Sequence, residues 1–234
     1  IGLNAMIILE DGSTYRGTGF GYPKTVGGEF VFNTGMVGYT ETLTDPSYRG
    51  QILCLTYPLI GNYGVPSNSI TDSYGLPKYF ESDNIQVSGL IVHELSTVAN
   101  HRECHKTLDQ WLYDEKIPGI SGIDTRDLTK KIRIKGVMKG GLSVSEKQIN
   151  TKELLNTIKR TKYDGFNFMS QVSVDKTVEY GDPKLEPIVL IDTGTKYSII
   201  RNILRMGYRV IRVPWDMSFS KIISYKPKGI IISN

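Results

Sequence analysis

The chain has 234 residues, a mass of 26.2 kDa and a net charge of +4. Its 39% hydrophobic and 22% charged residues exclude an intrinsically disordered chain and fit one large globular domain or two small ones. Two cysteines exclude a disulfide framework, and no apolar run approaches the roughly 20 residues of a membrane helix. With no signal-peptide pattern and a weak, dispersed positive charge, we expect a cytoplasmic protein with no nucleic-acid or membrane partner.

Short β-strands are expected over the first part of the chain, which is rich in glycine, aromatic and β-branched residues. A strand at 6–12 enters the Asp11–Gly12 turn, a hairpin signal, and strand-like sequence resumes at 13–17. Further apolar runs predict strands at 28–34, 51–58 and 85–92.

Apolar residues spaced three and four apart predict helices only after residue 100. The expected apolar faces are Leu108, Trp111 and Leu112, then Leu128 and Ile132, then Leu154, Leu155 and Ile158. Asp124 is expected to cap the second helix and Gly136 to end it, and Thr151 is expected to cap the third.

A polar segment with prolines near its end, 174–187, predicts a linker. The pattern after it is strand 188–192, a helix closed by Gly207, strand 208–214, a short helix at 218–225 and a strand ending at Ser233. This β-α-β-α-β order predicts a parallel sheet with right-handed crossovers. We therefore expect an α/β protein with a first domain at 1–173, whose last helix lies near 151–162, and the start of a second domain at 188–234.

Both ends of the chain suggest a longer protein. The first residue is Ile1 rather than Met, and the sequence stops at Asn234, directly after a strand that is typical of a buried parallel sheet. We expect further covering elements to follow such a strand.

Function in open parallel sheets is expected beyond the carboxyl ends of the strands, here 192–195, 214–216 and 233–234. Thr193-Gly194-Thr195 can hold an anion at a helix N-terminus, but it lacks the lysine and the length of a phosphate loop. A simple entry into the helix is the favoured interpretation.

Three other groups of residues contain side chains or glycines that are found in functional sites. The glycines of 17–21 lie within strand-like sequence, which favours a glycine-bent strand over a dinucleotide loop. His101 and His105 are four residues apart with Cys104 between them, but no matching ligand pair exists elsewhere, so a solvated helix start is favoured over a metal site. Cys54, between two leucines, is expected to be an inert core thiol.

The segment 40–50 is unusually rich in turn residues and hydrogen-bonding side chains, and Asp45-Pro46-Ser47 is a strong turn former. From spacing alone a plain connection is favoured, although Ser47 can make one hydrogen bond to a small polar ligand.

The residues resemble one family, the small, glutamine-hydrolysing subunit of carbamoyl-phosphate synthetase. The motifs that carry the resemblance run in order through the whole chain: Leu9-Glu10-Asp11-Gly12, 28–39, Thr44-Asp45-Pro46-Ser47-Tyr48, 56–64, 122–129 and Asp192-Thr193-Gly194-Thr195-Lys196.

The resemblance implies an N-terminal α/β domain of the swivelling β/β/α type that docks onto a large subunit, followed by a class I glutamine amidotransferase domain. In this heterodimeric ligase the glutaminase domain releases ammonia for the large subunit, which holds ATP and magnesium. The product enters arginine and pyrimidine biosynthesis. No cofactor or metal is expected in this chain.

By the same resemblance, Ser47 occupies the position that contacts bound glutamine. The Cys-His-Glu triad is expected beyond residue 234, as is a Gly-Pro-Gly loop, so residues 1–234 alone are expected to be inactive. Thr193, Thr195 and Lys228 depart from the family pattern at peripheral positions. The alternative hypothesis is a non-catalytic docking module of a larger complex.

Overall fold

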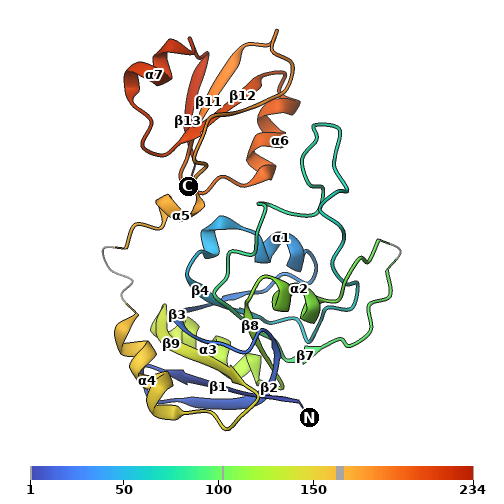
Figure 1. The fold of residues 1–234 in the computed structure, drawn as a ribbon, viewed down its shortest axis with the longest axis vertical. Coiled ribbons are helices and arrows are strands. Elements are labelled where there is room, and N and C mark those ends of the chain that lie inside the picture. The colour runs from blue at the N-terminus through green and yellow to red at the C-terminus, as the bar shows by residue number, and fades with distance from the viewer. Residues whose placement is uncertain (1, 102, 162–165, 234) are drawn as a thin grey trace.

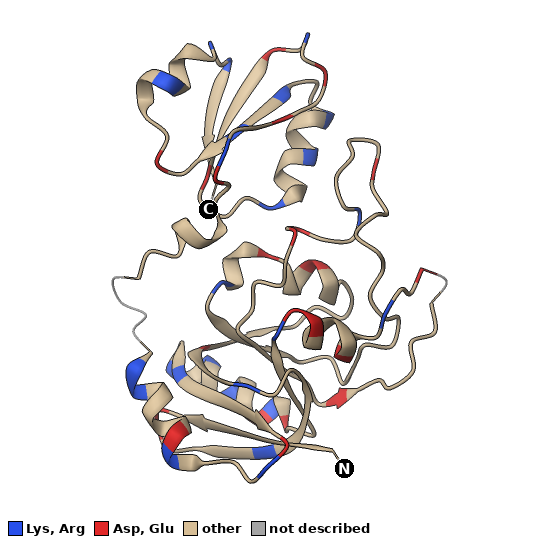
Figure 2. Cartoon of the chain, viewed as in Figure 1, with Lys and Arg blue, Asp and Glu red and all other residues tan. Residues whose placement is uncertain are grey.

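A computed structural model describes residues 2–101, 103–161 and 166–233. The fold has two parts, a β-barrel and a smaller open sheet, and the short helix α5 lies between them in Figure 1. We call these the barrel and the C-terminal sheet. In the view of Figure 2, acidic and basic residues are interspersed over both parts.

The barrel closes in the order β1-β2-β8-β6-β4-β3-β9. Its strands are β1 (Leu3–Leu9), β2 (Thr14–Gly21), β3 (Thr25–Asn33), β4 (Gln51–Leu55), β6 (Gly89–Ile91), β8 (Pro118–Ser121) and β9 (Met138–Ser145). The pairs β3–β4, β4–β6 and β6–β8 are parallel, and the other neighbours are antiparallel. Closure leaves the barrel without the unpaired edges that an open sheet has.

In the described ranges, four helices flank the barrel: α1 (Tyr39–Leu43), α2 (Leu108–Asp114), α3 (Thr125–Lys135) and α4 (Thr151–Arg160). The two faces of β1 show how they are held. Ile7 and Leu9 belong to the cluster that includes α3, whereas Met6 and Ile8 pack with Leu154 of α4. This alternation follows from the two-residue period of a strand.

The C-terminal sheet has the order β10-β12-β11-β13, from β10 (Val178–Tyr180), β12 (Arg209–Pro214), β11 (Pro187–Asp192) and β13 (Gly229–Ile232). The expected parallel pairing of β11 with β12 and with β13 is confirmed, as are the connecting helices α6 (Tyr197–Arg205) and α7 (Phe219–Ser224). The predicted linker contains β10, which pairs antiparallel with β12. The domain limits at 173 and 188 stay a prediction.

Several further expectations are corrected by the structure. A helix, α1, and a 3-10 helix (Pro46–Tyr48) form well before residue 100, and β8 and β9 were not predicted. The predicted strand at 85–92 is regular only as β6. Asn150, rather than Thr151, caps α4, because its side chain accepts hydrogen bonds from the Lys152 and Glu153 amides.

Three expectations about the barrel are confirmed. Asp124 caps α3 by accepting from the Asp127 amide, and Gly136 ends that helix. The glycine-rich 17–21 segment lies within β2, paired on both sides, and is not a nucleotide loop.

A long loop of the barrel reaches the C-terminal sheet. This loop (66–83) includes Leu76, which is 3% exposed and belongs to the apolar cluster formed by α6, β11 and β12. Figure 1 shows the loop rising beside α6. On this side of the described chain, the two parts of the fold therefore share an apolar core.

The remaining described elements are short: β5 (Leu59–Ile60) pairs with β7 (Glu94–Leu95), and α5 spans Met169–Val172. None of the helices in the described ranges has the length and apolar character needed to cross a membrane.

Candidate functional site

The predicted glutamine-contacting residue, Ser47, lies on the 3-10 helix Pro46–Tyr48. Asp45 caps this turn, since its carboxylate accepts a hydrogen bond from the Ser47 amide at 2.9 Å. Pro46 occupies the first position of the turn, where a missing N–H costs nothing. The Ser47 side chain is exposed, and its hydroxyl makes no hydrogen bond within the described part of the chain. The sequence therefore builds a capped turn that presents an exposed hydroxyl.

An ion pair joins this turn to the C-terminal sheet. Lys196 Nζ lies 3.4 Å from Asp45 Oδ2, and Lys196 is the residue directly before α6. Since α6 follows β11, the Ser47 turn lies at the carboxyl end of that strand, where open α/β sheets bind ligands. Spacing alone did not single out Lys196, although it stands in the Asp192–Lys196 motif that carried the resemblance.

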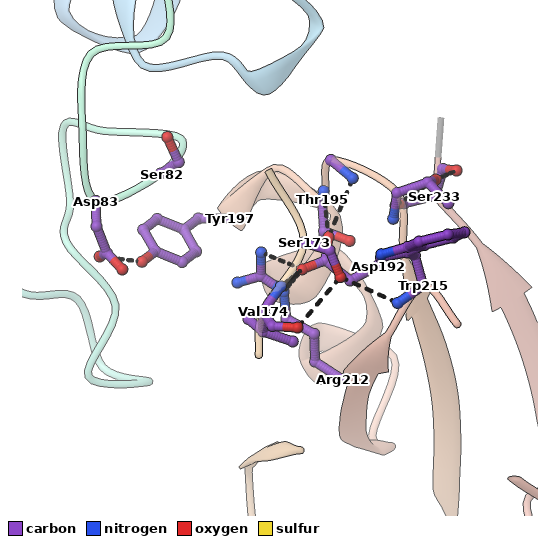
Figure 3. Close-up of polar contacts among 12 residues, drawn as sticks. Ser82, Asp83, Ser173, Val174, Asp192, Thr195, Tyr197, Arg212, Trp215 and Ser233 are labelled. Atoms are coloured by element: carbon purple, nitrogen blue, oxygen red, sulfur yellow. Dashed lines mark hydrogen bonds and ion pairs between the residues drawn. The ribbon is translucent and has the colours of Figure 1, made fainter. Parts of the chain in front are cut away.

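Asp192 organises the first carboxyl end of the sheet. It is 0% exposed, and its Oδ2 atom lies 2.7 Å from Arg212 Nη2. The same oxygen accepts hydrogen bonds from the Val174 amide and from Arg212 Nε, both at 2.8 Å. Figure 3 shows Asp192 at the centre of these contacts. A buried carboxylate needs such compensation, because desolvation otherwise opposes its charge.

The turn after β11 serves as a helix entry. Asp192 Oδ1 accepts hydrogen bonds from the Gly194 amide at 3.1 Å and the Thr195 amide at 2.8 Å. Gly194 has a φ of +120°, a conformation that other residues rarely adopt. Because a carboxylate of this chain already occupies these amides, the favoured prediction of a helix entry over an anion site is confirmed.

The three carboxyl ends of the sheet lie side by side, because β12 and β13 both pair in parallel with β11. The Thr193 amide after β11 donates to Ser233 Oγ after β13 at 2.9 Å. The Trp215 amide after β12 donates to Ser173 Oγ at 3.0 Å. Asn234 lies outside the described residues. This edge is thus fixed by hydrogen bonds between segments that are far apart in the sequence.

A groove of about 500 Å³ opens between the two parts of the fold. Its lining includes Asp83, Gln86, Tyr197 and Arg212, and burial raises the pKa of Tyr197, whose hydroxyl donates to Asp83. Figure 3 shows Tyr197 and Asp83 pointing toward one another. Ser47 is not among the lining residues, so the groove is separate from the Ser47 turn.

The described histidine and cysteine candidates are not grouped as metal ligands. His101, Cys104 and His105 precede α2 and are not helical, which corrects the expected helix start. Among the described residues, no group of three or more His, Cys, Asp or Glu side chains is placed to hold a metal ion. Cys54 is buried, and burial raises the pKa of its thiol to about 12, so the expectation of an inert thiol stands.

The chain is similar to known proteins over nearly its whole length. Residues 7–142 match the family model described as carbamoyl-phosphate synthase small chain, CPSase domain. The carbamoyl phosphate synthase small chain of Pyrococcus furiosus is 43% identical over 97% of this chain and 61% of its own length. The small chain of Sulfolobus acidocaldarius is 41% identical over 97% of this chain and 60% of its own length.

A further relative is the mitochondrial carbamoyl-phosphate synthase [ammonia] of Aquarana catesbeiana, 44% identical over 93% of this chain and 14% of its own length. The chain thus spans about three fifths of the small chains that it matches. From the family model, which covers more than half of its residues, we conclude that the chain belongs to the carbamoyl-phosphate synthase small-chain family.

Proposed function

We propose that this chain acts in the small subunit of a glutamine-dependent carbamoyl-phosphate synthase. In this proposal the small subunit hydrolyses glutamine and passes the ammonia to a large subunit, which carries ATP and magnesium and makes carbamoyl phosphate for arginine and pyrimidine synthesis in the cytoplasm. The barrel, proposed to be of the swivelling β/β/α type, docks onto the large subunit. This chain needs no cofactor of its own for that role.

One observation carries the site assignment, the ion pair between Asp45 and Lys196. It holds the Ser47 turn against the carboxyl end of β11, which supports a direct contact of Ser47 with a ligand bound at that edge. The exposed hydroxyl can accept from or donate to an amide or carboxylate, and glutamine carries both groups. The thiol, imidazole and carboxylate that cut the amide are proposed to come from residues outside this sequence.

Replacing Ser47 tests the assignment. In the complex of the whole small subunit with its large subunit, Ser47→Ala is expected to raise the KM for glutamine about fivefold, the effect of one hydrogen bond of about 1 kcal/mol. Synthesis from free ammonia is expected to stay unchanged, since ammonia bypasses the site. Ser69→Ala, an exposed serine of the barrel loop, is the matched control. Unchanged glutamine kinetics in Ser47→Ala would remove Ser47 from the site.

A second candidate function is a non-catalytic docking module. It is favoured by the similarity to a relative that is named for ammonia. The two functions differ in the nitrogen source of the assembled enzyme. Carbamoyl phosphate formation that responds to ammonia but ignores glutamine would support the docking module, and glutamine-dependent formation would support the enzyme subunit.

A further inference from the structure

The N-terminus of α6 is capped by the barrel rather than by its own segment. Lys196, the residue before the helix, provides no side-chain cap. Instead the Tyr197 amide donates to the backbone oxygen of Glu81 at 2.9 Å, and the Ser198 amide donates to Glu81 Oε2 at 2.8 Å. A carboxylate at this position also complements the positive end of the helix dipole. Glu81 thus ties the 66–83 loop to the helix that follows β11.

The same residue is bonded to the start of the Ser47 turn. The Glu81 amide donates to Thr44 Oγ1 at 2.9 Å, and Ser82 Oγ donates to the Thr44 backbone oxygen at 2.6 Å. Thr44 is 0% exposed, and its hydroxyl donates to the Thr40 carbonyl of α1 at 2.8 Å. A buried hydroxyl that both donates and accepts leaves Thr44 one conformation.

These contacts form a continuous path, which we call the Thr44–Glu81 bridge: α1, Thr44, Glu81 and the N-terminus of α6. Thr44 directly precedes Asp45, the cap of the Ser47 turn. The Asp45–Lys196 pair next to the bridge is partly open to water, with side chains that are 17% and 32% exposed. An ion pair that water can reach holds geometry weakly, whereas the bridge adds directional hydrogen bonds on either side of the fully buried Thr44 hydroxyl, which suits it to fix the turn.

We propose that the Thr44–Glu81 bridge positions Ser47 for its ligand, and that Thr44 and Glu81 are positioning residues that touch no substrate. This inference rests on the proposed glutamine contact of Ser47. The inference gives the 66–83 loop a second role besides joining the two parts of the fold. Through Glu81, the loop sets the position of Ser47 relative to the C-terminal sheet.

The test compares two substitutions at Thr44 in the complex of whole small and large subunits. Thr44→Val removes the hydroxyl at nearly constant volume, and Thr44→Ser keeps it. Thr44→Val is expected to raise the KM for glutamine roughly three- to tenfold, with ammonia-dependent synthesis unchanged, and Thr44→Ser is expected to restore the original KM. Glu81→Ala removes the hydrogen bond between the Glu81 carboxylate and the Ser198 amide, and it is expected to raise the KM for glutamine as well. This variant tests the bridge if Thr44→Val fails to fold.

Asp72→Asn is the matched control, because it weakens a different contact between the same two parts, the ion pair of Asp72 with Arg201 at 2.7 Å. It is expected to leave the glutamine KM unchanged. Amide exchange in residues 45–49 is expected to quicken in Thr44→Val and not in Asp72→Asn.

Ser47→Ala, measured alongside, separates the two ideas. If it leaves the glutamine KM unchanged, the proposed contact fails and the bridge loses its role with it. If Ser47→Ala raises the KM but neither Thr44→Val nor Glu81→Ala does, the contact stands and the bridge is overturned. An equal rise in Asp72→Asn also overturns the bridge, since general loosening between the two parts would then explain the effect.

Discussion

At two buried residues of this protein, Asp192 and Cys54, the surroundings determine whether the side chain is charged and how reactive it is. Asp192 and Arg212 form an ion pair with side-chain exposures of 0% and 8%, and both carboxylate oxygens of Asp192 accept hydrogen bonds. The carboxylate is thereby a structural centre that joins the segment before the sheet, β12 and the turn after β11. Cys54 differs from Asp192, because burial raises the pKa of its thiol and keeps the thiol in its neutral, unreactive form.

Removing the cation of the buried pair is expected to destabilise the fold strongly. Arg212→Met leaves the buried Asp192 charge without its cation, with only backbone amides to stabilise it, which costs about 3–5 kcal/mol. Arg209→Met is the matched control, because its partner Glu179 is 55% exposed and such pairs contribute about 1 kcal/mol or less. Urea denaturation of both variants measures the difference, and equal losses would show that burial does not set the cost.

The two cysteines are expected to differ in reactivity. A thiol reacts as its thiolate. With a pKa of about 12, almost none of the Cys54 thiol is ionised to thiolate near pH 8. Cys104 is partly exposed. Iodoacetamide is therefore expected to label Cys104 in the folded protein and Cys54 only after unfolding, as followed by peptide mass spectrometry. Equal labelling rates in the native state would contradict the buried position of β4.

At the scale of elements, the contact between the 66–83 loop and α6 combines charge with apolar packing. Arg201 of α6 pairs with Asp72 and donates to the Pro77 carbonyl. Burial opposes the ionisation of Asp72, but hydrogen bonds from Arg201 and from the Tyr74 and Leu76 amides outweigh it and lower the pKa of Asp72.

This contact is expected to weaken in acid. Because the folded-state pKa of Asp72 lies below its ordinary value of 3.8, its contribution to stability is present above pH 3.8 and is lost as the pH falls through the folded-state value. The stability difference between the original protein and Asp72→Asn is expected to shrink over that range in urea titrations at successive pH values. A difference that grows in acid would reverse the assigned sign.

The elements that sequence reasoning found and missed differ in physical character. The helix α6 was predicted from an apolar face of four residues, Ile199, Ile200, Ile203 and Leu204. The structure buries the last three, whereas Ile199 is only partly buried. β9 was missed because its Gly140 and Gly141 do not resemble a strand. A Cβ atom at Gly140 would come within 2.7 Å of the Ile8 carbonyl oxygen, so packing in the barrel requires glycine there.

The candidate site was predictable in part. The turn-forming Asp45-Pro46-Ser47 segment is a local pattern, and the structure forms that turn. Its connection to α6 through Glu81 and Thr44 is not local, since 37 residues separate those two positions. The periodicity of apolar residues predicts helices and strands, but it cannot predict a contact between residues so far apart. The short strand β10 was missed for a related reason, because its three residues gain their partner only from β12.

For the molecule as a whole, Leu76 unites the barrel and the C-terminal sheet. It is contributed by the barrel loop but packs in the cluster with Ile188, Leu190 and Ile200. Each part therefore has its own strands, whereas one of the apolar clusters is shared. We expect the two parts to resist unfolding together rather than independently.

Truncating Leu76 tests this coupling. Leu76→Ala is expected to cost about 2–5 kcal/mol, the range for a buried leucine. Leu185→Ala, at a position that is 38% exposed, is expected to stay within about 0.5 kcal/mol. Hydrogen exchange locates the loss: β11 and β12 are expected to lose protection with Leu76→Ala. Unchanged exchange in both strands would show that the sheet does not depend on the loop.

The shared position of Leu76 has a consequence for biosynthesis. A polypeptide leaves the ribosome from its N-terminus, and its parts fold as they emerge. The loop that carries Leu76 is synthesised more than a hundred residues before Ile188 and Ile200. Until these partners are synthesised, the apolar side chain of Leu76 stays in contact with water or with a chaperone. Slow translation just before β11 would lengthen that wait, and a nascent chain paused there is the species most open to misassembly.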